Sequence, residues 1–151
     1  MNSNKIEREI YTTFAEITAN MGYSEIHGRI LAALLVAGKP LSLTEVAHKI
    51  GVSVPAVSLS LDLLETLRMA RRVKMPGDRN LYVQLTGDLV AGLRTAFVAK
   101  ADRTIENTLA RFATYRKQIK SKDGLLRTLD KLEHEARRLK RYIGILAKAP
   151  L

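Results

Sequence analysis

Residues 41–85 hold the side chains best suited to bind a polyanion. Hydroxyl groups stand near the starts of two predicted helices, where backbone N–H groups can also contact phosphate. Basic side chains follow the second helix and occupy the tip of a predicted hairpin, where they can pair with phosphates. The candidate DNA-binding residues are Ser42, Thr44, Ser53, Val54, Pro55, Ser58, Leu59, Arg71, Arg72, Lys74, Asp78 and Arg79.

These residues are expected to do different chemistry. Ser53 and Ser58 can hydrogen-bond to a phosphate or a base edge, and Leu59 can make apolar contact in the major groove. Arg79 can enter a minor groove, whose negative potential favours arginine. Asp78, an acid, is expected to orient Arg79 or a neighbouring backbone N–H and not to touch phosphate.

Each assignment has a purely structural alternative. Ser42 and Thr44 could serve only to cap a helix, and the helix over residues 53–67 could be an ordinary core helix. Arg79 could be a solvated loop residue. The sequence leaves these alternatives open.

The elements that would position these residues follow from local patterns. Ser42-Leu43-Thr44-Glu45 fits a capping box, which starts a short helix that Gly51 ends. Ser53 caps the next helix, which has Pro55 in its first turn. The apolar residues of that helix recur at helical spacing, and they are Val57, Leu61, Leu64 and Leu67.

Alternation over residues 72–85 predicts a β-hairpin with a Pro-Gly-Asp-Arg-Asn tip at residues 76–80. Its apolar face, predicted to pack on the helices, comprises Val73, Met75, Leu81, Val83 and Leu85. The other face, predicted to point to solvent or DNA, comprises Arg72, Lys74, Tyr82 and Gln84.

Helices are also predicted on both sides of this region. Residues 4–20 and 24–37 show helical periodicity, and a long helical region opens at residues 86–88 and is interrupted at residues 121–124. The last helix carries a heptad seam of Leu125, Leu129, Leu132, Ala136, Leu139, Ile143 and Leu146. Such a seam must be buried against another helix, and we assign it to a homodimer interface.

The composition favours a polyanionic partner. The 151 residues carry a net charge of +10, with a pI of about 10.1. The excess is uneven: the net charge is zero over residues 1–40, +2 over 41–87 and +8 over 88–151. The basic C-terminal face could be a solvated helix face or could add nonspecific attraction to DNA.

Other classes of site are disfavoured. The chain has no cysteine, and its three histidines lack a metal-ligand spacing. No nucleophile elbow, phosphate loop or paired-carboxylate pattern appears. We expect no metal, no cofactor and no enzymatic activity. Without an apolar signal core or a membrane-spanning run, a cytoplasmic protein that does not bind membranes is expected.

Residues 24–85 resemble the winged-helix domain of GbsR-type regulators, a branch of the MarR superfamily of transcription factors. The matching residues are Gly28-Arg29-Ile30, Pro40-Leu41-Ser42-Leu43, Glu45, Ile50-Gly51-Val52-Ser53, Val57-Ser58, Leu61, Leu64-Glu65, Arg71-Arg72 and Pro76-Gly77-Asp78-Arg79. The resemblance implies a homodimer that binds an operator and that often senses a small molecule, which the sequence does not identify.

Two positions depart from the family pattern. A MarR-type wing usually carries a second arginine two residues after the aspartate, where this chain has Asn80. The exposed face of the second helix has few side chains able to make a bidentate base contact. Sequence specificity could therefore be modest, or rest on thymine methyl groups and DNA shape.

The sequence thus predicts a mostly α-helical winged helix-turn-helix protein with a small β-hairpin and long C-terminal dimerisation helices. We expect an N-terminal helix in the dimer interface (residues 1–22), a DNA-binding domain (23–86) and a dimerisation region (87–151). The expected function is sequence-specific binding of double-stranded DNA by a homodimeric transcriptional repressor. The alternative is a winged-helix protein–protein interaction module with a coiled-coil-like assembly helix.

Overall fold

The computed structural model describes residues 2–120 and 124–151, so most of the predicted interruption at residues 121–124 lies outside the described residues. The chain divides into two compact units, Met1–Leu93 (unit 1) and Arg94–Leu151 (unit 2). No helix among the described residues is long and apolar enough to cross a membrane.

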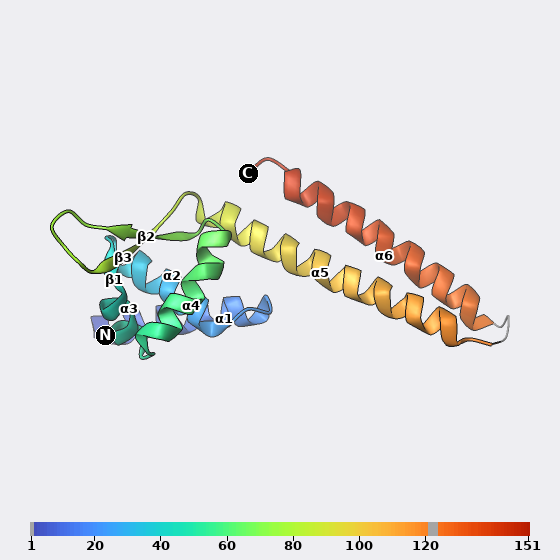
Figure 1. Ribbon diagram of the computed structural model, residues 1–151, viewed down its shortest axis with the longest axis horizontal. Coiled ribbons are helices and arrows are strands. Elements are labelled where there is room, and N and C mark those ends of the chain that lie inside the picture. Colours follow the sequence, from blue (N-terminus) through green and yellow to red (C-terminus); the bar gives the residue numbers. More distant parts are fainter. Residues whose placement is uncertain (1, 121–123) are drawn as a thin grey trace. The chain divides into compact units, whose positions relative to one another are not determined.

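Unit 1 has the order of elements that defines a winged helix (Figure 1). Two helices, α1 (Ser3–Asn20) and α2 (Glu25–Ala37), precede the helix-turn-helix pair α3 (Leu43–Ile50) and α4 (Val54–Thr66). The hairpin strands β2 (Ala70–Lys74) and β3 (Leu81–Leu85) follow, and α5 (Leu89–Gln118) begins in this unit. The predicted fold class is confirmed.

The predicted helix ends are also confirmed, because the capping chemistry is local. The side chain of Ser24 caps α2, and that of Ser53 caps α4. Ser42 and Glu45 form the complete capping box at the start of α3. Gly38 and Gly51 end α2 and α3 with positive φ angles of 63° and 73°, a conformation that glycine adopts without steric cost.

The sheet has three strands, one more than the sequence predicted. A two-residue strand, β1 (Leu41–Ser42), pairs antiparallel with β3, so the order is β1-β3-β2. Leu41 lies opposite Val83, and both are buried. A two-residue strand carries no alternation that a sequence pattern could detect.

The predicted faces of β2 are wrong. In the observed register Arg72 lies opposite Val83, and Val73 lies opposite Tyr82. Directly opposed residues share a face of the sheet, so Arg72 lies on the face of the buried Val83, the side predicted for apolar residues. The reason is a set of oxygen acceptors on α4, carried by Ser58, Asp62 and Glu65, to which the Arg72 guanidinium donates.

The core of unit 1 depends on a close crossing of α1 and α2. A Cβ placed on Gly28 would lie 2.0 Å from the carbonyl oxygen of Phe14, so any larger residue there would collide with the α1 backbone. Ala15 and Ala32, also small, are buried nearby on these two helices. The core continues through Ile30, Leu31 and Leu34 to the apolar faces of α3, α4 and the sheet.

Unit 2 consists of the remainder of α5 and of α6 (Gly124–Lys148), which run side by side in opposite directions (Figure 1). Ion pairs join the two helices near both ends. Arg116 of α5 pairs with Asp130 and Glu133 of α6, and Lys140 of α6 pairs with Asp102 and Glu106 of α5. Between these ion pairs, the α6 residues that lie on the same face of the helix as Glu133 and Lys140 point toward α5.

The predicted heptad seam therefore divides into two parts. Leu129 is buried, and Ala136 and Ile143 are half-buried on the side of α6 that faces α5. The other four seam residues stay exposed, with exposed fractions of 58% for Leu125, 45% for Leu132, 52% for Leu139 and 41% for Leu146. Only these four, spaced by seven residues, remain available to a second molecule.

We predict that Gly28→Ala destabilises the protein by about 1–3 kcal/mol, because the added methyl group must displace the α1 backbone. The matched control is Gly144→Ala in α6, where a Cβ would meet nothing within 4 Å. That change should be neutral or should stabilise by about 0.5–1 kcal/mol, since alanine favours helix. Urea unfolding followed by circular dichroism measures both, and equal stability of the two variants would contradict the close crossing.

Candidate nucleic-acid interface

The second helix of the helix-turn-helix, α4, presents a mixed surface. Its inner face buries Val57, Leu61 and Leu64. On the outer face Leu59 has 74% of its surface exposed, and Val54 has 37% exposed. Ser58, expected to be exposed like Leu59, is half-buried, so Leu59 is the dominant outward side chain in the middle of this helix.

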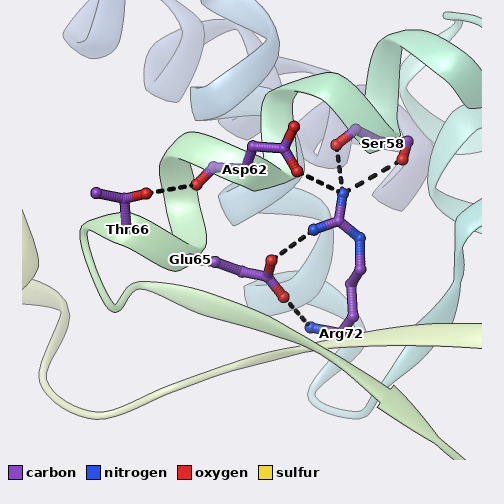
Figure 2. A network of polar contacts seen from close by, with 5 residues as sticks. All are labelled: Ser58, Asp62, Glu65, Thr66 and Arg72. Atoms are coloured by element: carbon purple, nitrogen blue, oxygen red, sulfur yellow. Dashed lines mark hydrogen bonds and ion pairs between the residues drawn. The ribbon is translucent and has the colours of Figure 1, made fainter.

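Arg72 binds this helix through four groups (Figure 2). Its Nη2 donates to the carbonyl oxygen of Ser58 at 2.6 Å, to the Ser58 hydroxyl at 3.2 Å and to Oδ1 of Asp62 at 2.9 Å. Its Nη1 donates to the carboxylate of Glu65. The backbone N–H of Arg72 donates to the other Glu65 oxygen at 2.7 Å, so the network joins β2 to three successive points on α4.

This network changes the electrostatics of the candidate interface. Burial lowers the pKa of Arg72, but the hydrogen bond to Asp62 and the charge of Glu65 outweigh burial and raise the pKa above its ordinary value. The guanidinium is therefore always charged and offsets part of the negative charge that Asp62 and Glu65 place on α4. Arg72 was predicted to contact phosphate, but the structure commits its donors to α4 instead.

The start of α3 is organised by the capping box. The Ser42 hydroxyl accepts from the N–H of Glu45 at 3.1 Å, and the Glu45 carboxylate accepts from the N–H of Ser42 at 2.7 Å. The backbone hydrogen bond from Ser42 holds the pKa of Glu45 below its ordinary value. The Ser42 side chain is thus engaged in capping, whereas Thr44 is exposed in the first turn of the helix.

The hairpin tip is ordered by Asp78. One carboxylate oxygen accepts from the N–H of Asn80 at 2.9 Å, and the other accepts from the hydroxyl of Tyr82 at 2.7 Å. These bonds, the first of them foremost, lower the pKa of Asp78, and Asp78 in turn raises the pKa of Tyr82. Arg79 is exposed beside this turn and, among the described residues, has no ion-pair partner.

The predicted site residues thus fall into separate groups. Ser42 and Ser53 cap helices, and Arg72 binds α4. Exposed side chains are found at Thr44, Val54, Pro55, Leu59, Arg71, Lys74 and Arg79. Asp62 and Glu65 were not predicted as partners of Arg72, and Tyr82 was not predicted as a partner of Asp78. A signal was present for the first pair, because Ser58, Asp62 and Glu65 are spaced by four and three residues on one helix face.

Comparison with known proteins supports the fold. No family model matches the sequence, and no curated protein matches it. A solved structure described as a transcriptional regulator matches with a TM-score of 0.61 and 18% sequence identity, over 94% of this chain and 96% of that chain. At this identity the match shows a shared fold over nearly the full length of both chains.

Two further solved structures match less well. An S. aureus MepR variant bound to an oligodeoxyribonucleotide has a TM-score of 0.46 and 19% identity, over 89% of this chain and 93% of that chain. NadR in complex with 4-hydroxyphenylacetate has a TM-score of 0.45 and 19% identity, over 87% of each chain. Both scores are below 0.5, too low to establish a shared fold.

We predict that Arg72 and Glu65 are energetically coupled. A double-mutant cycle with Arg72→Met and Glu65→Gln should give a coupling free energy of about 1–2 kcal/mol by urea unfolding, because both groups are partly shielded and the hydrogen bonds are charge-assisted. Arg71→Gln, at the exposed neighbouring position, should change stability by about 0.5 kcal/mol or less. Additive effects of the two network substitutions would show that the network does not link the hairpin to α4.

Proposed function

We propose that this chain is a transcriptional regulator of the MarR superfamily, of the GbsR type, that binds duplex DNA sequence-specifically as a homodimer and acts as a repressor. The observation that carries the proposal is the winged helix itself. Its second helix exposes an outer face, and its hairpin tip exposes an arginine with no ion-pair partner among the described residues. The fold shared with a solved transcriptional regulator supports the same reading.

In this proposal residues 23–86 read the DNA. The outer face of α4, with Ser53, Val54, Pro55, Ser58 and Leu59, enters the major groove, and Arg79 enters the adjacent minor groove. A leucine that is 74% exposed at the centre of that face suits contact with thymine methyl groups. Thr44, Arg71 and Lys74 are exposed and contact phosphates, while Asp78 and Arg72 hold the tip and α4 in place.

The dimer in this proposal is formed by residues 1–22 and 87–151. Its support is the row of exposed leucines on α6, Leu125, Leu132, Leu139 and Leu146, whose spacing of seven residues keeps them on one stripe of the helix. On α1, Ile6 and Ile17 are exposed as well, at 43% and 41%. A second copy of the chain would remove these apolar side chains from water. A small molecule that controls binding is part of the proposal, and we assign it no identity.

One observation favours a second candidate function, a winged-helix module that binds another protein. Unit 1 contains ten basic and nine acidic residues, so the unit that would read DNA has a net charge of only +1. Most DNA-binding domains depend on a clear basic excess for affinity. In this alternative the exposed stripe of α6 binds a helix of a different protein, and the hairpin does not meet DNA.

We predict that the hairpin tip and α4 contribute differently to DNA binding. Arg79→Ala should weaken binding to every duplex, because its contribution is mainly electrostatic. Leu59→Ala should lower the preference for a selected duplex over a random one by about 1–3 kcal/mol per base it reads, with little change for random DNA. The measurement is titration of a duplex selected by the wild-type protein from a random library, and of a random duplex of equal length.

The control for this experiment is Lys39→Ala, which removes an exposed cation of unit 1 that lies outside the candidate interface. It should behave as the wild-type protein does on both duplexes. If Leu59→Ala and Arg79→Ala also bind both duplexes with wild-type affinity while remaining folded, this face does not contact DNA. The protein-binding alternative would then be preferred.

We predict that charging the exposed stripe of α6 separates the dimer and leaves the protomer folded. Leu132→Glu with Leu139→Glu should give a monomer by light scattering with unchanged helical content, because both side chains are about half exposed within the chain. Loss of two interface leucines removes roughly 1.5–3 kcal/mol each. Lys131→Glu with Arg138→Glu, on the opposite side of α6, is the control and should remain dimeric. A well-folded dimer of the leucine variant would exclude this stripe as the interface.

A further inference from the structure

Unit 2 holds nearly all of the net positive charge of the protein. Residues 94–151 contain fifteen basic and six acidic residues, a net charge of +9, against +1 for residues 1–93. The net positive charge therefore lies on α6 and on the part of α5 that follows residue 93, and neither segment belongs to the winged helix. A dimerisation role needs no such excess, because like charges on two copies repel each other.

The ion pairs within unit 2 leave most of this charge uncompensated. Its five described carboxylates, on Asp102, Glu106, Asp130, Glu133 and Glu135, all form ion pairs. They share only three cations, which are Arg116, Arg138 and Lys140. Four of the five carboxylates form ion pairs that join α5 to α6, so they are already committed to holding the two helices together.

The outer side of α6 carries a continuous row of basic residues. Arg127, Lys131, His134, Arg138 and Arg141 are spaced by four, three, four and three residues, so they lie on one face, which we call the basic stripe. All five are exposed. Among the described residues, Arg127, Lys131 and Arg141 have no ion-pair partner. Rows of like charge at these spacings destabilise a helix by themselves, so the stripe suits a partner that neutralises it.

We propose that the basic stripe of α6 is a second duplex-DNA-binding surface, which supplies the nonspecific part of the affinity that the nearly neutral winged helix lacks. The inference deepens the proposed function and rests on it. Its argument is charge complementarity: the stripe spans about 21 Å along α6 from Arg127 to Arg141, and duplex DNA presents a negative charge about every 1.7 Å of its axis. An anionic membrane is a weaker match, because a helix that lies on lipid must bury an apolar face in it. In the proposed function the exposed leucines of α6, Leu125, Leu132, Leu139 and Leu146, are buried in the dimer.

The salt dependence of binding tests this surface. In the full-length protein, Arg127→Gln, Lys131→Gln and Arg141→Gln are combined, since glutamine keeps the helix propensity and removes the charge. The matched control combines Lys39→Gln, Lys49→Gln and Arg68→Gln, three exposed cations of unit 1 that lie outside residues 1–22 and outside the candidate DNA-binding residues. Binding to a random duplex is measured from low to moderate salt, with helical content checked by circular dichroism.

We expect the stripe variant to lose at least tenfold in affinity at low salt, and the slope of log K against log salt to become shallower by about 2 to 3 for each stripe of the dimer that contacts the duplex. The unit 1 control should keep the wild-type slope. Exchange of Arg127 and Arg141 for lysine should also keep it, because the charge is retained. A stripe variant with the wild-type slope and affinity overturns the inference.

Two further outcomes identify which proposal has failed. If the wild-type protein binds no duplex even at low salt, the proposed function fails and the inference fails with it. If the wild-type protein binds, and only Leu59→Ala and Arg79→Ala weaken it, the function stands and the stripe is excluded. Vesicles of phosphatidylglycerol and phosphatidylcholine form a separate arm. Wild-type binding to them that the stripe variant loses, with an unchanged duplex slope, overturns the inference in favour of a lipid surface.

Discussion

The contact between Arg72 and α4 fixes the geometry on which the candidate interface depends. A winged helix can grip DNA only if its second helix and its hairpin hold a constant relative position, because each must enter its own groove. Arg72 joins them directly, through the side chains of Asp62 and Glu65 and the backbone and hydroxyl of Ser58. The backbone bond from Arg72 to Glu65 adds a link that does not depend on the rotamer of the arginine.

The same contact explains how α4, which we propose to approach DNA, can carry two acids. An unpaired carboxylate on the outer face of α4 would repel phosphates, and Asp62 is 66% exposed. Placing a guanidinium between Asp62 and Glu65 reduces that repulsion without adding a cation that could grip phosphate. The central exposed side chain of α4 is therefore the apolar Leu59. In the proposed function such a surface discriminates among sequences by shape and methyl groups, and it contributes little nonspecific attraction.

The sequence predicts those features of the fold and of the candidate site that are set by residues close together in the chain. It does not predict features that depend on contacts between distant residues. The capping box at Ser42 and Glu45, the glycine turn at Gly51 and the hairpin tip are set by residues within a few positions of each other, and all were predicted. The face of Arg72 was not, because alternation within a strand assumes that inward positions are apolar. Its partners lie seven, ten and fourteen residues earlier on a helix. The strand β1 was missed for a similar reason, since only its pairing with β3 defines it.

The heptad pattern of α6 correctly predicts a helix with apolar residues along one side, but it does not show which of these residues pack against α5. A helix of this length has room for three kinds of surface, because successive residues turn by about 100°. Leu129, with the ion-paired Glu133 and Lys140, is directed to α5, and Leu125, Leu132 and Leu139 lie beside that face and remain exposed. The basic stripe occupies the opposite side. The residues predicted as one seam therefore belong to two surfaces of α6. One surface packs against α5, and the other is exposed to solvent. The interaction of α6 with α5 uses only the first, so the exposed leucines and the cations of the stripe are free to serve different partners on different sides of one helix.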